Sequence, residues 1–146
     1  MSTYFDSGII VKLYVPEPNS AEAIRLVTAL PSPALLTDWQ AIEVRNAVRL
    51  KRFRGEITSA QLRAALRAMA EDERLGRWQR PALDLAETLR RSEVLSRKFA
   101  PSLGCRTLDI VHVAAALLVG ARDFASFDVR QRQLAKKARL RVIPRV

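Results

Sequence analysis

The chain has 146 residues, enough for one domain with a real hydrophobic core, so we expect residues 1–146 to form a single domain. Its 25 Lys and Arg residues against 15 Asp and Glu give a net charge of +10, which favours a polyanionic partner such as a nucleic acid but names no reaction. One cysteine, Cys105, excludes an internal disulfide, and one histidine, His112, leaves too few soft ligands for a zinc site.

The predicted elements alternate between strands and helices. Short apolar runs bounded by turn residues predict strands at 3–6, 34–37, around Trp78, 124–127 and 141–143. Periodicity and helix breakers predict a helix at 9–14, an amphipathic stretch at 21–27, and helices at 39–53, after Thr58, from Asp84 to Pro101, at 108–119 and at 129–138. This alternation is typical of an α/β fold with a parallel sheet.

Capping residues mark several of the predicted helix starts. Thr58 and Gln61 are spaced as a capping box, and Asp84 with Glu87 has the same spacing at the next helix. Thr107 is a candidate cap for helix 108–119, which is apolar nearly all round and should therefore be buried.

Two further features concern location. The longest apolar run, residues 113–121, is far shorter than the ~20 residues that a membrane helix needs. The first residues show no basic segment followed by an apolar one, so nothing resembles an export signal. We therefore expect a cytoplasmic protein that does not enter a membrane.

Four acids stand at positions where a carboxylate is costly to bury: Asp6, Glu43, Asp109 and Asp128. Asp6 and Asp128 come at the ends of predicted strands, and strand ends of a parallel sheet project into the crevice where ligands bind. Glu43 lies one turn inside helix 39–53. Asp109 lies in the first turn of helix 108–119, with His112 one turn later on the same face.

A cluster of such carboxylates needs a compensating cation, because unit charges about 4 Å apart repel by several kcal/mol at a surface-like dielectric. Mg²⁺ or Mn²⁺ supplies that compensation, since these ions prefer oxygen ligands and bind through a few carboxylates plus substrate phosphate. The ion can then activate a water for attack on phosphorus. The acid pattern therefore indicates nuclease chemistry.

Each candidate residue also has an ordinary structural explanation. Asp6 and Asp128 could cap the helices that follow them, and Asp109 could simply favour a helix dipole. A helical Glu such as Glu43 is usually solvated, and a lone His such as His112 is usually a hydrogen-bonded core residue. Polar neighbours of the acids could orient water or phosphate, or could only cap helices and close turns; they are Ser7, Thr107 and Ser126. Cys105 has no neighbours that form a catalytic triad, which favours a structural role.

Four segments in order resemble the signature blocks of the PIN-domain family, and the similarity extends over essentially the whole chain. They are Tyr-Phe-Asp-Ser-Gly at 4–8, Ile-Glu-Val-Arg-Asn-Ala at 42–47, Leu-Asp-Ile-Val-His-Val-Ala-Ala-Ala at 108–116 and Ser-Phe-Asp at 126–128. Within that family, the length, the third block and the stretch Ser-Phe-Asp-Val-Arg-Gln are most similar to VapC-type toxins.

The resemblance implies a three-layer α/β/α sandwich around a mostly parallel central sheet, with an acidic pocket for Mg²⁺ or Mn²⁺. By position, the metal-binding and catalytic acids would be Asp6, Glu43, Asp109 and Asp128. Ser7 and Ser126 would lie at the pocket, with His112 in support. The resemblance further implies an endoribonuclease acting on structured RNA such as tRNA or rRNA, a homodimer, and a cognate antitoxin that blocks the pocket. Asp128 is the acid whose role varies within the family.

Two other functions remain open on sequence grounds. A non-catalytic basic α/β module that binds RNA or DNA explains the charge but leaves the acid pattern unexplained, and aromatic residues for base stacking are sparse at 6%. A different Mg²⁺-dependent phosphoryl-transfer enzyme could use Asp6 as a nucleophile, but that class would need a second acid soon after it. A P-loop NTPase is excluded, because no glycine-rich Gly-Lys-Ser/Thr motif is present.

Overall fold

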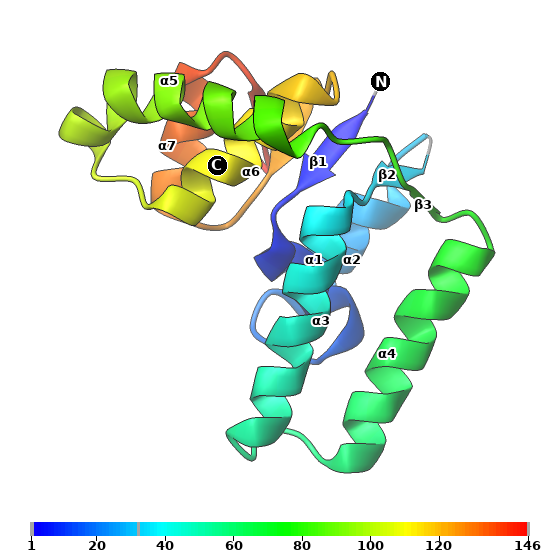
Figure 1. The fold of residues 1–146 in the computed structure, drawn as a ribbon. Helices are drawn as coiled ribbons and strands as arrows, with labels where there is room; N and C mark the ends of the chain where they lie inside the picture. The colour runs from blue at the N-terminus through cyan, green and yellow to red at the C-terminus, as the bar shows by residue number, and fades with distance from the viewer. Residues whose placement is uncertain (1, 32, 146) are drawn as a thin grey trace. The chain divides into compact units, whose positions relative to one another are not determined.

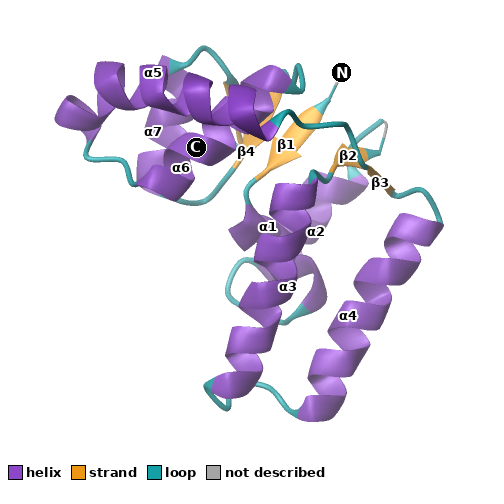
Figure 2. Ribbon diagram, in the orientation of Figure 1, coloured by secondary structure: helices purple, strands orange, loops and turns teal. Residues whose placement is uncertain are grey.

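The computed structural model describes residues 2–31 and 33–145. Within them the elements alternate along the chain, as Figures 1 and 2 show. They are β1 (Thr3–Phe5), α1 (Ser7–Tyr14), α2 (Ser20–Thr28), β2 (Ala34–Leu35), α3 (Asp38–Phe53), α4 (Ser59–Arg74), β3 (Trp78–Gln79), α5 (Leu85–Leu103), α6 (Thr107–Leu118), β4 (Asp123–Ala125), α7 (Val129–Lys137) and β5 (Arg141–Ile143). The chain forms two compact units, the first made of Met1–Asp6 with Pro81–Val146 and the second of Ser7–Arg80.

The first unit is built on three parallel strands. β4 pairs with β1 on one side and with β5 on the other, with Phe124 opposite both Tyr4 and Val142. The pairing continues past the strand ends, because the backbone N–H of Asp6 donates to the Ala125 carbonyl at 3.0 Å. Helices α5, α6 and α7 pack against one another in this unit.

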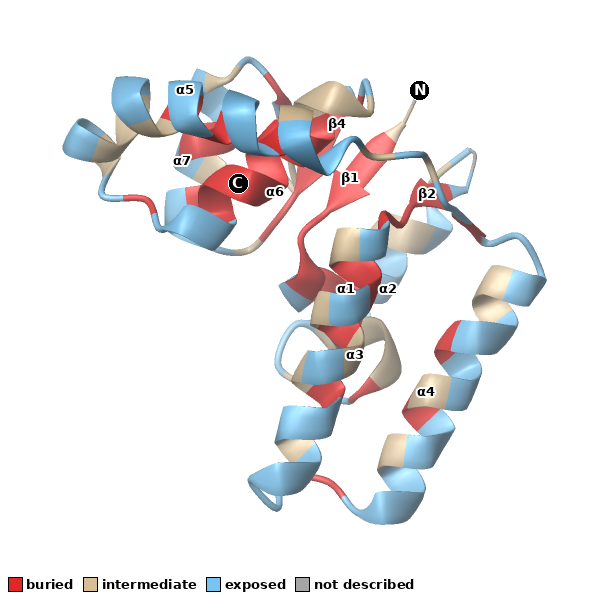
Figure 3. Cartoon of the chain, viewed as in Figure 1, coloured by how far each residue is buried: buried red, intermediate tan, exposed pale blue. Residues whose placement is uncertain are grey.

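Helix α6 is the buried centre of the first unit. Every residue from Asp109 to Ala116 is buried, and Figure 3 shows the helix coloured as buried over most of its length. This confirms the expectation drawn from its apolar composition. A helix with so little polar surface gains its stability from burying apolar area on all sides.

The second unit combines two short parallel strands with four helices. Ala34 of β2 pairs with Trp78 of β3, and the backbone N–H of Leu36 extends the pairing to the Gln79 carbonyl at 2.8 Å. Helix α1 packs on α2, α3 and α4. Strand pairing in both units is parallel, with helices between the strands in sequence, so the predicted α/β class is confirmed.

Two predicted helix starts are confirmed by their caps. The Thr58 hydroxyl accepts from the Gln61 backbone N–H at 3.1 Å, and the Gln61 side chain accepts from the Thr58 backbone at 2.7 Å. The Asp84 carboxylate likewise accepts from the backbone N–H of Glu87 at 3.0 Å. Each cap satisfies donors that the first helical turn leaves without intrahelical partners.

Other boundaries differ from prediction. Helix α3 begins at Asp38, one residue earlier than expected, because Thr37 and Gln40 form a second capping box. Helix α5 continues through Pro101 to Leu103, since a proline close to the helix end removes only one backbone bond there. Thr107 is the first residue of α6 rather than its cap, and the Asp109 carboxylate accepts from the preceding Arg106 backbone N–H at 3.1 Å.

In the described part of the chain, no helix is both long enough and apolar enough to cross a membrane.

Tyr14 connects α1 to two other elements of the second unit. Its hydroxyl donates to the Asp72 carboxylate and accepts from the Trp78 indole N–H, each at 2.7 Å. Burial is the main cause of a strongly raised pKa of Tyr14, so the phenol stays protonated and keeps donating throughout the neutral range.

We predict that Tyr14→Phe lowers the free energy of unfolding by about 1–3 kcal/mol, because it removes two hydrogen bonds from half-buried and buried partners. Urea denaturation followed by tryptophan fluorescence measures this change. The control is Phe53→Leu at a side chain that is 88% exposed, which should alter stability by less than about 0.5 kcal/mol. Equal stability of wild type and Tyr14→Phe would show that these bonds contribute nothing net.

Candidate active site

Asp6 directly follows β1 and is only 7% exposed. Its backbone is fixed beside the end of β4 by the bond from its N–H to the Ala125 carbonyl. Its carboxylate oxygen Oδ2 accepts a short hydrogen bond from the hydroxyl of Ser126, a fully buried residue just past β4. The first unit therefore holds an acid and a hydroxyl in contact where two parallel strands end.

Ser126 is itself held from several directions. Its hydroxyl accepts from the backbone N–H of Asp128 at 3.0 Å and lies 3.0 Å from the side-chain amide of Gln131, which is buried in α7. Its own backbone N–H donates to the Ile143 carbonyl at 3.1 Å. Because the hydroxyl has so little freedom, it fixes the orientation of the Asp6 carboxylate.

Arg132 of α7 also stabilises the turn that contains Ser126. Its guanidinium donates to the Ser126 carbonyl and to the Pro144 carbonyl, each at 2.7 Å. These two bonds tie the chain after β4 to the chain after β5. The geometry around Asp6 thus depends on α7 as well as on the strands.

Asp109 is the second buried acid of the first unit, at 8% exposure in the first turn of α6. One oxygen, Oδ2, accepts from the Arg106 backbone N–H at 3.1 Å and lies 3.6 Å from Nε of the same arginine. The capping contact therefore occupies one oxygen of this carboxylate, and a negative charge near this helix start is favoured by the helix dipole.

A contact between Tyr4 and His112 shows where Asp109 lies relative to Asp6. The Tyr4 hydroxyl lies 2.8 Å from His112 Nδ1, with both side chains buried. Helix α6 leads by a short turn into β4, which is parallel to β1, so the helix runs opposite to β1. Asp6 therefore lies beyond Tyr4 in the same direction in which Asp109 lies beyond His112, toward one end of the first unit.

The distances along the two elements are similar. Asp6 follows Tyr4 by two residues, about 6.6 Å along a strand and on the same strand face. Asp109 precedes His112 by one helical turn, about 4.5 Å along the axis. Both buried carboxylates consequently lie at the carboxyl end of β1, on the side of the strand that faces α6.

Asp128 lies differently from the prediction. Strand β4 ends at Ala125, two residues earlier than expected, so Asp128 is the N-cap of α7 and not the last residue of a strand. Its Oδ1 accepts from the Gln131 backbone N–H at 2.9 Å, and the residue is exposed. The ordinary capping explanation holds for this oxygen, and a role as a metal ligand stays a prediction.

Ser7 and Glu43 belong to the second unit. Ser7 is the first residue of α1 and is buried, while Glu43 lies in the second turn of α3 and is half-buried. Its intermediate exposure excludes a fully solvated side chain. Their predicted participation with the acids of the first unit stays a prediction.

The chemistry of the donors fits a hard divalent cation. Asp6, Asp109 and Ser126 provide buried oxygen atoms at one end of the first unit, and Mg²⁺ typically takes one or two carboxylates and keeps several waters. Among residues 2–31 and 33–145, no group of three or more His, Cys, Asp or Glu side chains is close enough together to hold a metal. The metal site of four acids therefore stays a prediction. Two of its acids, Asp6 and Asp109, are buried in the first unit.

Cys105 lies just before α6 and is buried. Burial is the main cause of a raised pKa of its thiol, with the charge of Asp109 adding to it. A thiol that stays protonated is a poor nucleophile, which agrees with the structural role expected for it.

Sequence reasoning missed Gln131, Arg132 and Tyr4 as parts of this region. Gln131 stands three residues after Asp128, the spacing of a capping pair, so its backbone contact could have been found. Tyr4 and Asp6 are two residues apart, so they lie on the same strand face. The hydrogen bond from Tyr4 to His112, however, joins residues 108 positions apart. No local pattern identifies such a partner.

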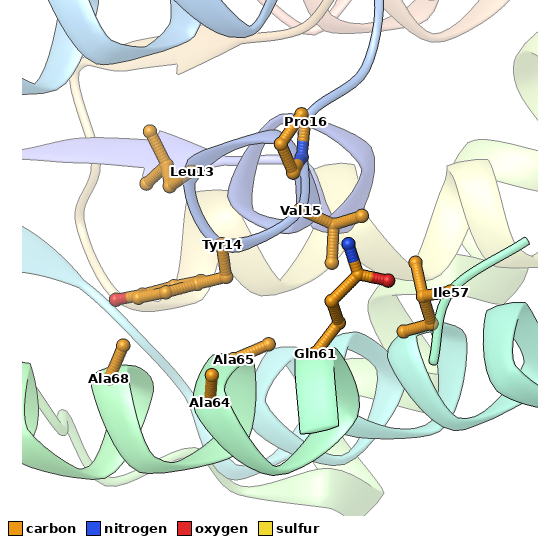
Figure 4. A pocket seen from close by; sticks show the side chains of 9 residues that line it. All are labelled: Leu13, Tyr14, Val15, Pro16, Ile57, Gln61, Ala64, Ala65 and Ala68. Atoms are coloured by element: carbon orange, nitrogen blue, oxygen red, sulfur yellow. The ribbon is translucent and has the colours of Figure 1, made fainter. Parts of the chain in front are cut away.

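A hollow of about 300 Å³ lies within the second unit, between the end of α1 and α4. Figure 4 shows it lined mainly by aliphatic side chains, with Ile57 at one end, the Tyr14 ring at the other, and Gln61 between them beside Val15. It contains no carboxylate or basic side chain. This hollow therefore lacks the groups needed for phosphodiester chemistry.

No protein-family model matches the sequence. No curated protein matches it either.

Solved structures are similar to the chain over nearly its whole length. VapC20 of Mycobacterium tuberculosis, described as a sarcin–ricin loop cleaving toxin, has 16% identity and a TM-score of 0.66 over 97% of this chain and 99% of its own. FitAcB of Neisseria gonorrhoeae has 16% identity and a TM-score of 0.64 over 99% and 97%. A toxin–antitoxin complex from Klebsiella pneumoniae has 14% identity and a TM-score of 0.61 over 90% and 89%.

At these identities the similarity concerns the fold, and it agrees with the resemblance of the sequence blocks around Asp6, Glu43, Asp109 and Asp128. The chain has the PIN-domain fold of VapC-type toxins.

Proposed function

We propose that this protein is a Mg²⁺- or Mn²⁺-dependent endoribonuclease and the toxin component of a type II toxin–antitoxin module. The observation that carries the proposal is the buried Asp6 carboxylate, held by Ser126 at the strand ends, with buried Asp109 at the same end of β1. Burying two acids is costly unless something compensates their charge. A nuclease that binds a cation there has a reason to keep both.

Each residue has a distinct role in this proposal. Asp6 and Asp109 bind the ion, and Ser126 keeps the Asp6 carboxylate in one orientation. When bound, the ion activates a water for attack on the phosphodiester and offsets the charge that develops on the phosphate oxygens. By their positions in the family pattern, Glu43 and Asp128 complete the set of acids and Ser7 contacts the phosphate, while His112 supports α6 through Tyr4.

The substrate in this proposal is a structured RNA such as tRNA or rRNA. VapC20, which shares the fold, is described as cleaving the sarcin–ricin loop, and the net charge of +10 favours association with a polyanion. An RNA substrate would place the reaction in the cytoplasm. We further propose a cognate antitoxin as the inhibiting partner, since a related fold occurs in a toxin–antitoxin complex, and a homodimer as the assembly.

The second candidate function is a basic module that binds nucleic acid without cutting it. The charge of +10 supports this alternative equally well. In such a module the contacts with Arg106 explain Asp109, but nothing explains why the buried Asp6 carboxylate lies at the same end of β1. Cleavage assays separate the two candidates.

We predict that purified protein cuts a tRNA and rRNA preparation at discrete positions with Mg²⁺ or Mn²⁺ and not with EDTA. Asp6→Asn and Asp109→Asn should each lower the cleavage rate by at least about 100-fold, the scale of a catalytic group, because the amide keeps the shape but loses the charge. The matched control is Glu93→Gln, an exposed acid of α5 in the same unit, which should cut normally. RNA that is bound but never cut, or is cut equally in EDTA, would favour the binding module.

We also predict that Ser126→Ala lowers cleavage by roughly 10–100-fold at limiting Mg²⁺, the usual effect of removing a residue that orients a ligand. Raising the Mg²⁺ concentration should restore part of the activity, because the alanine variant binds the ion more weakly. Ser102→Ala, at an exposed serine of α5, serves as the control. A Ser126→Ala variant with unchanged Mg²⁺ dependence would contradict a positioning role for this hydroxyl.

A further inference from the structure

A basic pocket of about 290 Å³ lies in the second unit and is separate from the apolar hollow described above. Residues of α1 and α3 and of the chain just after each line it: Gly8, Val11, Lys12, Glu17, Ala47, Leu50, Lys51 and Arg54. We refer to it as the basic pocket. Its lining carries three cations and one carboxylate, and Glu56 pairs with Lys51 from outside the lining, which leaves one positive charge in surplus.

Glu17 contacts both lysines of the basic pocket, and Lys51 also contacts Glu56 at 3.3 Å. Lys12 donates to Glu17 Oε2 at 3.0 Å, and Lys51 makes a short bond to Glu17 Oε1. The side chains of Lys12, Lys51 and Glu17 are only 17–19% exposed. The Glu17 bond is the main cause of a raised pKa of Lys51, so this ammonium is charged at neutral pH.

Arg54 adds a third cation at the end of α3. It is exposed, and within the described residues no ion pair joins its guanidinium to an acid. The lysine charges are shared with the Glu17 carboxylate and, for Lys51, also with Glu56 at 3.3 Å, but the Arg54 charge is not offset in this way. A guanidinium of this kind can form two parallel hydrogen bonds to the oxygens of one phosphate.

The basic pocket continues the face of α3 that carries Glu43. Glu43, Ala47, Lys51 and Arg54 follow one another at helical spacing, so they form a single stripe along the helix. Lys51 is about 12 Å along the axis from Glu43, at 1.5 Å per residue. A nucleic acid strand carries a phosphate about every 3.4 Å of duplex axis, so this distance corresponds to a few nucleotides.

We propose that the basic pocket binds a backbone phosphate of RNA a few nucleotides from the scissile bond. This inference rests on the proposed ribonuclease function, because Glu43 belongs to the proposed set of acids. An RNA phosphate is favoured over an acidic peptide, because the basic pocket lies on the same stripe of α3 as Glu43 of the proposed ribonuclease site and the net charge of +10 favours a polyanion. Glu17 holds both lysines in position when no phosphate is bound.

The test is binding of a fluorescein-labelled oligouridylate, measured by fluorescence anisotropy over a series of salt concentrations in EDTA. The full chain carrying Asp6→Asn is used, so that no cleavage occurs. Arg54→Gln added to this chain should weaken binding several-fold and lower the slope of log K against log salt by about 0.7, the value for one phosphate contact on a single strand. Arg67→Gln is the matched control, because it removes the same charge from an exposed position on α4.

Glu17→Gln provides a second variant with the opposite expected effect. The amide has one oxygen and can accept from only one of the two lysines, and it carries no charge that competes with a phosphate, so binding should become tighter. Equal slopes for Arg54→Gln and Arg67→Gln, or no gain from Glu17→Gln in a variant whose melting temperature is unchanged, would overturn the proposal. Polyglutamate serves as the acidic-peptide probe. If Arg54→Gln lost polyglutamate binding but kept oligouridylate binding, the proposal would be overturned in favour of an acidic peptide.

These outcomes are independent of cleavage. If wild-type protein cuts RNA but Arg54→Gln and Arg67→Gln behave alike, the basic pocket is not a phosphate site and the nuclease proposal is unaffected. If no RNA is ever cut but the slopes differ as expected, the basic pocket binds phosphate in a module that lacks catalysis.

Discussion

The hydrogen bond between the Ser126 hydroxyl and the Asp6 carboxylate is the contact on which the geometry of the candidate active site depends. It joins residues 120 positions apart, and it exists only because β1 and β4 are neighbours and end together. The backbone bond from Asp6 to Ala125 sets the register, and Gln131 and Arg132 of α7 hold Ser126 in the turn that follows. Packing in the first unit thus determines the orientation of one acid.

The charge distribution gives the protein two kinds of site. The end of β1 collects buried negative charge from Asp6 and Asp109, whereas the basic pocket in the second unit collects positive charge around Glu17. A polyanionic substrate would be repelled by the first without a cation and attracted by the second. In the proposed reaction on RNA, cation-dependent chemistry in one place and phosphate binding in the other would complement each other.

Local patterns in the sequence were sufficient for the fold class and for many elements. The Thr58–Gln61 capping box, the apolar helix around Val113 and the last strand at 141–143 were predicted and are confirmed, because each depends on neighbours in the chain. Boundaries failed where a competing cap or a position near a helix end altered the result, as at Thr37 and Pro101. Asp6 and Ser126 could be singled out as candidates from their strand ends, but their hydrogen bond and the link from Tyr4 to His112 depend on tertiary packing that no local pattern records.

The most direct test of the central claim is anomalous diffraction at the manganese edge from crystals of the wild-type protein soaked in MnCl₂. We predict an anomalous peak within coordination distance of the Asp6 and Asp109 carboxylates, with Ser126 still donating to Asp6. Absence of a peak at these two acids, in crystals that show well-ordered side chains there, would contradict a metal-dependent active site at the end of β1.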